Sequence, residues 1–446
     1  MDKSKAMDGE GGVFVERLTH IEARLDEMRQ MLLDLSGKVE QVNQRASSAL
    51  YMDIIGKMAP QLLPYLVPQV EGLEVSSKWD LSGYAQGGGP KWLRTSAGRA
   101  LMWLGTSLSA IPFSKRREFM LQALELTERD ELALLYGRYL NILLSRGGYT
   151  WADMLPECRR FESAVSHVRN ANCPYAWMVC LAANGEAGCD ADVVRLFREG
   201  RKRSDLSPEM LYEIPLAAYH ARRCGVAVRE SDVAADLIDM SLRARRNGSL
   251  RQAFCRRRVA IVGGGPQERG KGKGTEIDDH DTVIRINHLP GEEHWGDYGR
   301  KTDIFVFGEM ATIPDHLPSG LEILWLLPGF SWHRWELHDL RRLYDIVTER
   351  GITLVASSQE DIAAVIDPEI YSQYTGGLLV MALVKRESGF LREKSLYGFH
   401  HSNPEVKEYS HYTSAEGASS WAHKDPMASY HNLLLEKKCY RDLLAK

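Results

Sequence analysis

The sequence predicts an α/β fold in which a C-terminal, mostly parallel Rossmann-like sheet follows an all-helical region and an N-terminal coiled coil. Three observations lead to this prediction. The run VAIVGGG (259–265) is typical of a buried strand that ends in a tight turn. Further apolar runs alternate with helical segments, which indicates a parallel sheet covered on both faces. Finally, the first 50 residues carry an apolar seam of heptad spacing.

The sheet is expected within residues 251–446, which we take as one domain. Besides the strand at 259–262, the predicted strands are 283–286, 303–307, 322–327, 353–356 and 395–399, with helices at 336–350 and 377–387. Ligands of such sheets bind beyond the carboxyl ends of the strands, so the glycine turn at 263–265 marks the expected ligand edge. Glycine permits close backbone approach, and a helix start presents N–H groups to a phosphate.

Three other regions precede this domain. Apolar residues from Phe14 to Ala49 alternate at spacings of four and three, so residues 1–50 are expected to form a coiled coil that makes the chain a homo-oligomer through residues 14–49. An amphipathic helix folded onto its own domain is the alternative. Prolines and a glycine run mark 51–90 as a linker. Residues 91–250 have periodic apolar faces and glycine-containing breaks, which is typical of a helical, repeat-like domain similar to tetratricopeptide arrays.

Composition restricts the class of protein. A net charge of −4 over 446 residues argues against general nucleic-acid binding. The seven cysteines lack metal-like pairs and are expected to be free thiols in a reducing compartment. No long apolar run and no signal peptide is visible, so a cytoplasmic protein is expected. The arginine-dense stretch 243–258 is interpreted as a solvated helix end, with contact to an anionic acceptor or to head groups at the inner face of the membrane as the alternative.

The glycine turn alone is ambiguous, because similar turns open flavin- and nicotinamide-binding domains. In the G-x-G-x-x-G pattern the third glycine would fall on Glu268, which would point a carboxylate at a pyrophosphate. An FAD- or NAD-binding oxidoreductase is therefore the weaker interpretation.

A longer pattern is more specific. The stretch from Val259 to Pro290 resembles the large sialylmotif of glycosyltransferase family 29, with its E-I-D-x-H-D-x-V-x-R-x-N core at residues 276–287. Residues 374–399 are similar to the small sialylmotif, and His411-Tyr412 to the short third motif. His431 and Glu436 reproduce the H-x-x-x-x-E of the very small motif. The resemblance spans residues 258–446.

The resemblance implies an inverting, metal-independent glycosyltransferase that moves sialic acid or a related nonulosonic acid from a CMP-sugar to an acceptor hydroxyl. The donor would be a CMP-activated 2-keto sugar acid, and no cofactor is expected. The acceptor would be a glycan, a glycolipid or a protein. A CMP-Kdo-dependent transferase of capsule or lipopolysaccharide synthesis is an alternative within the class, and a non-catalytic oligomeric scaffold is one outside it.

By the same resemblance, His431 is the base that takes the acceptor proton and His411 the partner of the departing phosphate, roles that an imidazole suits near neutral pH. Four further residues are expected to brace the fold rather than bind a metal: Asp278, His280, Asp281 and Glu436. The expected donor-binding residues are Gly263, Gly264, Gly265, Asn287, Thr375, Gly376 and Gly398.

The chain departs from the family pattern at three places. Gly264 stands where the family has an asparagine, which removes one expected donor contact. Arg258 and Glu387–Ser388 stand where the luminal enzymes place a disulfide between the large and small motifs. Thr413 replaces an aromatic residue of the third motif. The absence of that disulfide suggests a bacterial, cytosolic relative.

Overall fold

A computed structural model gives the fold of one compact unit, which comprises Leu101–Ser420 and Tyr430–Lys446. The described residues are 102, 105, 113–127, 129–146, 148–168, 173–226, 233–255, 258–308, 313–330, 335–366, 375–399 and 433–445. The predicted coiled coil (1–50) and linker (51–90) lie outside them.

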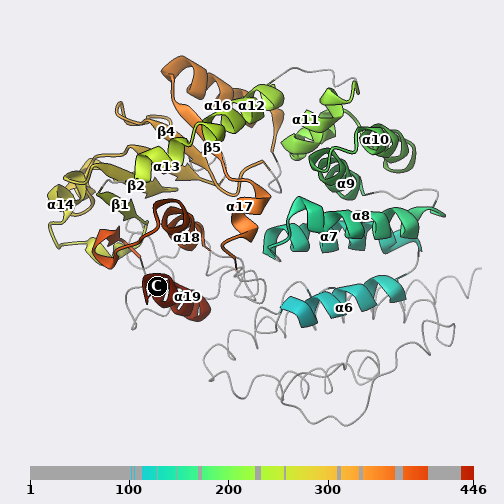
Figure 1. Ribbon diagram of the computed structural model, residues 1–446, viewed down its shortest axis with the longest axis horizontal. Coiled ribbons are helices and arrows are strands. Elements are labelled where there is room, and N and C mark those ends of the chain that lie inside the picture. Colours follow the sequence, from blue (N-terminus) through green and yellow to red (C-terminus); the bar gives the residue numbers. More distant parts are fainter. Residues whose placement is uncertain are drawn as a thin grey trace, which may run out of the picture. The chain divides into compact units, whose positions relative to one another are not determined.

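The first described part is helical, as predicted (Figure 1). Its helices are α6 (Phe113–Leu126), α7 (Arg129–Arg146), α8 (Trp151–Val165), α9 (Pro174–Glu186), α10 (Asp190–Ser204) and α11 (Pro215–Arg223). Local signals set their starts: Thr150 and Asp153 form a capping box at α8, and Pro174 opens α9. The rings of Phe161 and Trp177 meet edge to face at 5.0 Å and join α8 to α9. Neighbouring helices thus stack through buried apolar faces.

The second part is a six-stranded sheet in which every described pairing is parallel, so the predicted α/β class with a mostly parallel sheet is confirmed. The spatial order is β5-β4-β3-β2-β1-β6. The strands are β1 (Val259–Val262), β2 (Thr282–Ile286), β3 (Ile304–Phe307), β4 (Ile323–Leu326), β5 (Thr353–Ala356) and β6 (Leu396–Tyr397). Nearly all of their side chains are buried, as expected for a parallel sheet covered on both faces. The strand predicted at 395–399 is shorter because Gly398 leaves the extended conformation at φ +67°.

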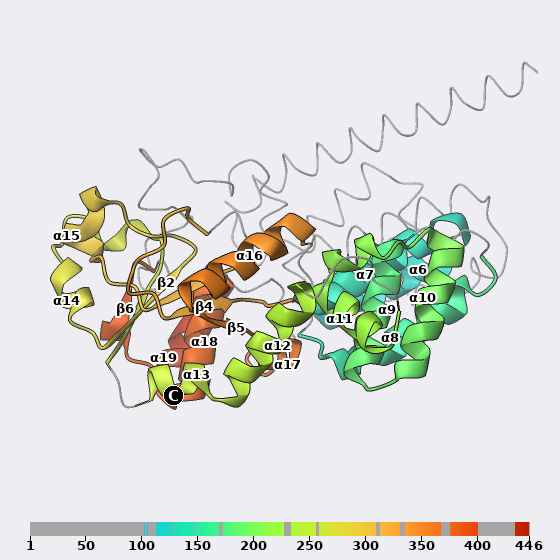
Figure 2. The same cartoon turned by 90° about the horizontal axis from the view of Figure 1, so that it is seen from above.

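Helices cover both faces of this sheet (Figures 1 and 2). One apolar cluster joins strand residues such as Ile261 and Trp325 to α12 (Val233–Arg246), α13 (Ser249–Phe254), α18 (Gly376–Ser388) and α19 (Leu433–Ala445). A smaller cluster on the opposite face joins Val262 and Tyr397 to α14 (Gly274–Asp278) and α15 (Trp295–Tyr298). The remaining helices are α16 (Leu337–Arg350) and α17 (Gln359–Ala363).

Two hydrogen bonds join the region predicted to be helical (91–250) to the predicted sheet domain (251–446). The N–H of Ala356 in β5 donates to Ser241 Oγ of α12 at 2.7 Å, and Gln359 Nε2 donates to the Leu144 carbonyl at 2.8 Å. The domain division at residue 250 stays a prediction, although α12 and α13 share the core of the sheet.

Two further findings concern the cysteines and the character of the helices. All seven cysteines are free thiols. None of the helices in the described ranges has both the length and the apolar character needed to cross a membrane.

Candidate active site

The strand order fixes where a ligand site is expected. From β1 the chain builds the sheet in one direction as far as β5, and then β6 returns to the other side of β1. In open parallel sheets, the crevice at the carboxyl ends of the strands where the order reverses is the usual ligand site. Here that point lies at the ends of β1 and β6, where the predicted donor residues Gly263 and Gly398 stand.

The two glycine segments touch through their backbones. The N–H of Gly263 donates to the Tyr397 carbonyl and the N–H of Gly265 to the Gly398 carbonyl, each at 2.8 Å. A Cβ on Gly263 would lie 2.7 Å from the Gly398 carbonyl oxygen, and a Cβ on Gly398 would lie 2.6 Å from that of Gly263. Only residues without side chains fit at this approach, which joins the large motif to the small one. Gly264 beside them is partly exposed.

Asn287 follows β2 at the same edge. Its backbone has φ +59°, and its N–H donates to the Val306 carbonyl at 2.8 Å. Asparagine visits this left-handed region more readily than most residues, and such conformations concentrate at functional sites. A Cβ built on Gly376 would lie 4.0 Å from Asn287 Nδ2. The amide therefore lies beside the N-terminus of α18.

Thr375 caps α18, and Glu436 of α19 holds it in place. The Thr375 hydroxyl accepts the Leu378 N–H at 3.3 Å and donates to Glu436 Oε2 at 2.8 Å, while the Thr375 N–H donates to Glu436 Oε1 at 2.9 Å. Glu436 is fully buried, and a carboxylate is stabilised at a helix N-terminus. Both polar groups of Thr375 are thus engaged, and Gly376 follows it as the first residue of the helix.

The charged residues of the large motif make internal contacts. Asp278 accepts the N–H groups of Arg300 and Lys301 at 3.0 and 2.9 Å. Asp281 accepts the Arg258 N–H at 2.9 Å, and this bond is the main reason why the pKa of Asp281 is lowered. His280 Nδ1 lies 2.9 Å from the Glu276 carbonyl oxygen. No group of three potential metal ligands gathers within the described ranges, and metal independence stays a prediction.

Sequence reasoning missed two residues that shape the glycine-rich loop. Asp297 accepts the N–H groups of Gly270 at 2.7 Å and Gly272 at 2.8 Å, and these bonds lower the pKa of its carboxyl group. The buried Tyr298 donates its hydroxyl to the Gly265 carbonyl at 2.8 Å. A lone Asp-Tyr pair carries no periodic or motif signal, and only the close approach of α15 to the loop reveals its role.

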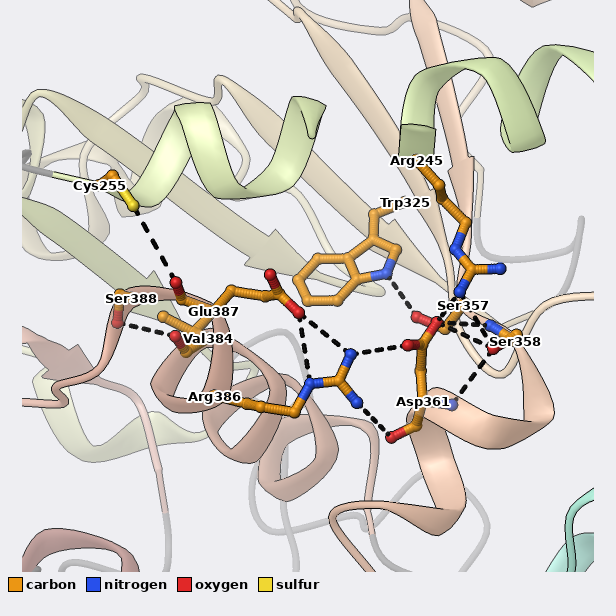
Figure 3. Close-up of polar contacts among 10 residues, drawn as sticks. All are labelled: Arg245, Cys255, Trp325, Ser357, Ser358, Asp361, Val384, Arg386, Glu387 and Ser388. Atoms are coloured by element: carbon orange, nitrogen blue, oxygen red, sulfur yellow. Dashed lines mark hydrogen bonds and ion pairs between the residues drawn. The ribbon is translucent and has the colours of Figure 1, made fainter. Parts of the chain in front are cut away.

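Ion pairs anchor the far half of α18 near the place of the absent disulfide (Figure 3). The Asp361 carboxylate of α17 forms ion pairs with Arg386 of α18 and Arg245 of α12, each with an N···O distance of 2.6 Å. Burial alone would raise the pKa of Asp361, but these arginines and the Ser358 N–H lower it overall. Cys255 Sγ lies 4.0 Å from the Glu387 carbonyl oxygen. Ion pairs therefore join α12, α17 and α18 at this place.

The two histidines expected to be catalytic, His411 and His431, lie outside the described residues, as does Thr413. What the described structure brings together is the rest of the predicted set: the glycine turn, Asn287, the start of α18 and Gly398 meet at one edge. Asp278, His280 and Asp281 lie away from this edge, in and after α14.

In open parallel α/β sheets, a glycine turn at the switch point is the usual place for a nucleotide-type ligand. Residues 216–321 match the model of glycosyltransferase family 29 (sialyltransferase). The matched segment runs from α11 to the end of the loop before β4 and contains the large motif. This part of the chain is therefore similar to glycosyltransferases of the sialyltransferase type.

Two solved structures are also similar. One is a mammalian sialyltransferase in complex with Gal-beta-1-3GalNAc-ortho-nitrophenol, at 19% identity over 47% of this chain and 82% of that one, with a TM-score of 0.32. The other is a mammalian sialyltransferase at 20% identity over 47% and 81% of the two chains, with a TM-score of 0.31. Among curated proteins, none matches this chain.

Proposed function

We propose that this protein is a glycosyltransferase that moves sialic acid or a related nonulosonic acid from its CMP ester to an acceptor hydroxyl, with inversion and without a metal ion. The observation that carries the proposal is the convergence of Gly263, Asn287, Gly376 and Gly398 at the switch point of the sheet. Chain segments more than 100 residues apart meet there, and they are the segments that resemble the family's large and small motifs.

The chemistry of the donor suits these groups. The sugar leaves CMP through an oxocarbenium-like transition state in which negative charge builds on the phosphate. In the proposal the N–H groups of Gly376 and Gly377 and the Asn287 amide stabilise this anion, because a helix N-terminus favours negative charge. Thr375, whose polar groups bind Glu436, fixes the start of the helix rather than touching the donor.

The family resemblance assigns proton transfer to His431 and stabilisation of the leaving group to His411. His431 takes the proton of the acceptor hydroxyl as the bond to the anomeric carbon forms, and His411 stabilises the departing phosphate oxygen. General acid–base groups of this kind contribute about 10²- to 10⁴-fold in rate. The acceptor is a glycan, on a lipid or a protein.

The test is hydrolysis of a panel of CMP-sugars, including CMP-sialic acid and CMP-Kdo, without acceptor. We expect release of CMP from at least one donor and a fall of at least about 100-fold in His431→Ala. His338→Ala, at an exposed position of α16, is the matched control and should keep wild-type activity. Absence of CMP release from every donor, or full activity in His431→Ala, would contradict the proposal.

A second variant tests the described edge. Asn287→Gly keeps the left-handed backbone but removes the amide, so KM for the donor should rise about tenfold while the fold is retained. An unchanged KM would remove Asn287 from the donor site.

A further inference from the structure

A second pocket opens at the other end of the sheet. It has a volume of about 460 Å³ and is lined by the start of β1, the C-terminal end of α18 and the segment 390–395. Volumes in this range hold small organic ligands. Helix α18 runs from Thr375 at the donor edge to Ser388 at this pocket, and its 13 residues span about 20 Å. The pocket is therefore separate from the proposed donor site.

The short β6 explains why space is left there. Leu396 and Tyr397 pair only with Ile261 and Val262, so β6 does not cover Val259 at the start of β1. Val259, Val384 and Leu391 line the uncovered space with apolar atoms. Phe390 adds an aromatic ring that is 44% exposed, one of the few large apolar side chains so exposed in the described part of the chain.

The lining charges are mainly positive. Arg258, Arg392 and Lys394 face one carboxylate, that of Glu276. The Glu276 carboxylate is already engaged, because it pairs with Lys273 and accepts the Tyr397 hydroxyl at 2.9 Å. Both of these bonds lower the pKa of Glu276 and keep it ionised.

Two of the three cations have no carboxylate partner among the residues that the structure describes. Arg258 pairs with Asp281 at 3.4 Å. Arg392 lies over the Phe390 ring with its guanidinium 5.6 Å from the centroid. Both Arg392 and Lys394 are exposed, and neither is seen in an ion pair with a described residue. An arginine and a lysine beside an aromatic ring and an apolar floor suit an anion attached to an apolar body.

We propose that this pocket, with Arg392 and Lys394 at its rim and Phe390, Val259 and Leu391 in its wall, binds an organic phosphate in which the phosphate is attached to an aromatic or alkyl group. The phosphate pairs with the two cations, and the attached group covers the apolar wall. The ligand has two possible sources, a soluble phosphate ester or a phospholipid head group with its first acyl carbons.

The test is calorimetric titration of the full chain with phenyl phosphate. We expect binding that weakens at least tenfold in the double variant Arg392→Glu/Lys394→Glu and stays unchanged in Lys438→Glu/Arg441→Glu, a double variant at two exposed positions of α19 with the same change of charge. Equal affinity in the double variant and the wild type, or no binding at millimolar phenyl phosphate, would overturn the proposal. Inorganic phosphate should bind at least tenfold more weakly than phenyl phosphate. Equal affinity would refute a contribution of the apolar wall to binding.

Two further experiments distinguish this pocket from the donor site and identify the source of its ligand. Saturating CMP should leave the affinity for phenyl phosphate unchanged, and displacement by CMP would assign the binding to the donor edge and overturn the proposal. If the chain does not bind CMP, the proposed function fails while the double-variant comparison still reports on this pocket. Cosedimentation with phosphatidylcholine vesicles that contain phosphatidic acid is compared between the wild type and the double variant. If the double variant loses vesicle binding, the ligand is a lipid. If it loses only the binding of phenyl phosphate, the ligand is a soluble phosphate ester.

Discussion

The contact between Thr375 and Glu436 gives the sharpest prediction, because it joins the small motif to the very small motif through a buried carboxylate. Glu436→Gln replaces one acceptor oxygen by an NH₂ group that cannot accept the hydrogen bond from Thr375. Thr375→Val removes the hydroxyl, which both donates to Glu436 and caps α18. A hydrogen bond to a charged group contributes about 1.5–3 kcal/mol, so each single change should lower the free energy of unfolding by about 2 kcal/mol.

The two changes should not be additive, because they remove the same contact. A double-mutant cycle measured by urea unfolding should give a coupling free energy of about 1.5 kcal/mol. Hydrogen exchange should be faster at the first amides of α18 in all three variants. Thr348→Val and Glu349→Gln, at exposed positions of α16, are matched controls and should change stability by under about 0.5 kcal/mol. A coupling free energy near zero would refute the view that Glu436 acts through Thr375.

Three further predictions can be tested separately. Gly398→Ala should be more destabilising than Gly389→Ala by at least about 2 kcal/mol in urea unfolding, because both positions have positive φ but only a Cβ at 398 meets a backbone atom, the Gly263 carbonyl oxygen at 2.6 Å. Equal losses would show that the approach is loose. Asp361→Asn should lower the free energy of unfolding by about 2 kcal/mol at pH 7, since Arg245 and Arg386 each lose an ion pair with the carboxylate. The folded-state pKa of Asp361 is lowered from 3.8, so its contribution is complete above that value and is lost as pH falls through the folded-state pKa; the difference between wild type and variant should shrink there, and a constant difference would contradict the ion pairs. Deleting residues 1–50 should reduce the number of subunits per particle, as measured by light scattering. An unchanged number of subunits would refute the coiled coil.

The sequence alone determined the class of fold and the location of the strands. Runs such as 259–262 and 353–356 are continuously apolar, and burial on both faces of a parallel sheet requires this pattern, so the local signal and the tertiary environment agree. The motif residues also pointed to one edge, because a glycine turn after a strand has few other uses. What the pattern could not give was the partner of each residue.

Those partners depend on contacts between residues far apart in the chain, and only the tertiary structure decided them. Nothing in the spacing of Thr375 and Glu436 shows that the Glu436 carboxylate accepts hydrogen bonds from both the N–H and the hydroxyl of Thr375. Asp297 is likewise ordinary in sequence, and its role arises because α15 brings it under the loop at 270–272. The shortness of β6 has the same origin: Gly398 must turn away to meet Gly263, and that turn leaves the start of β1 open beside the second pocket.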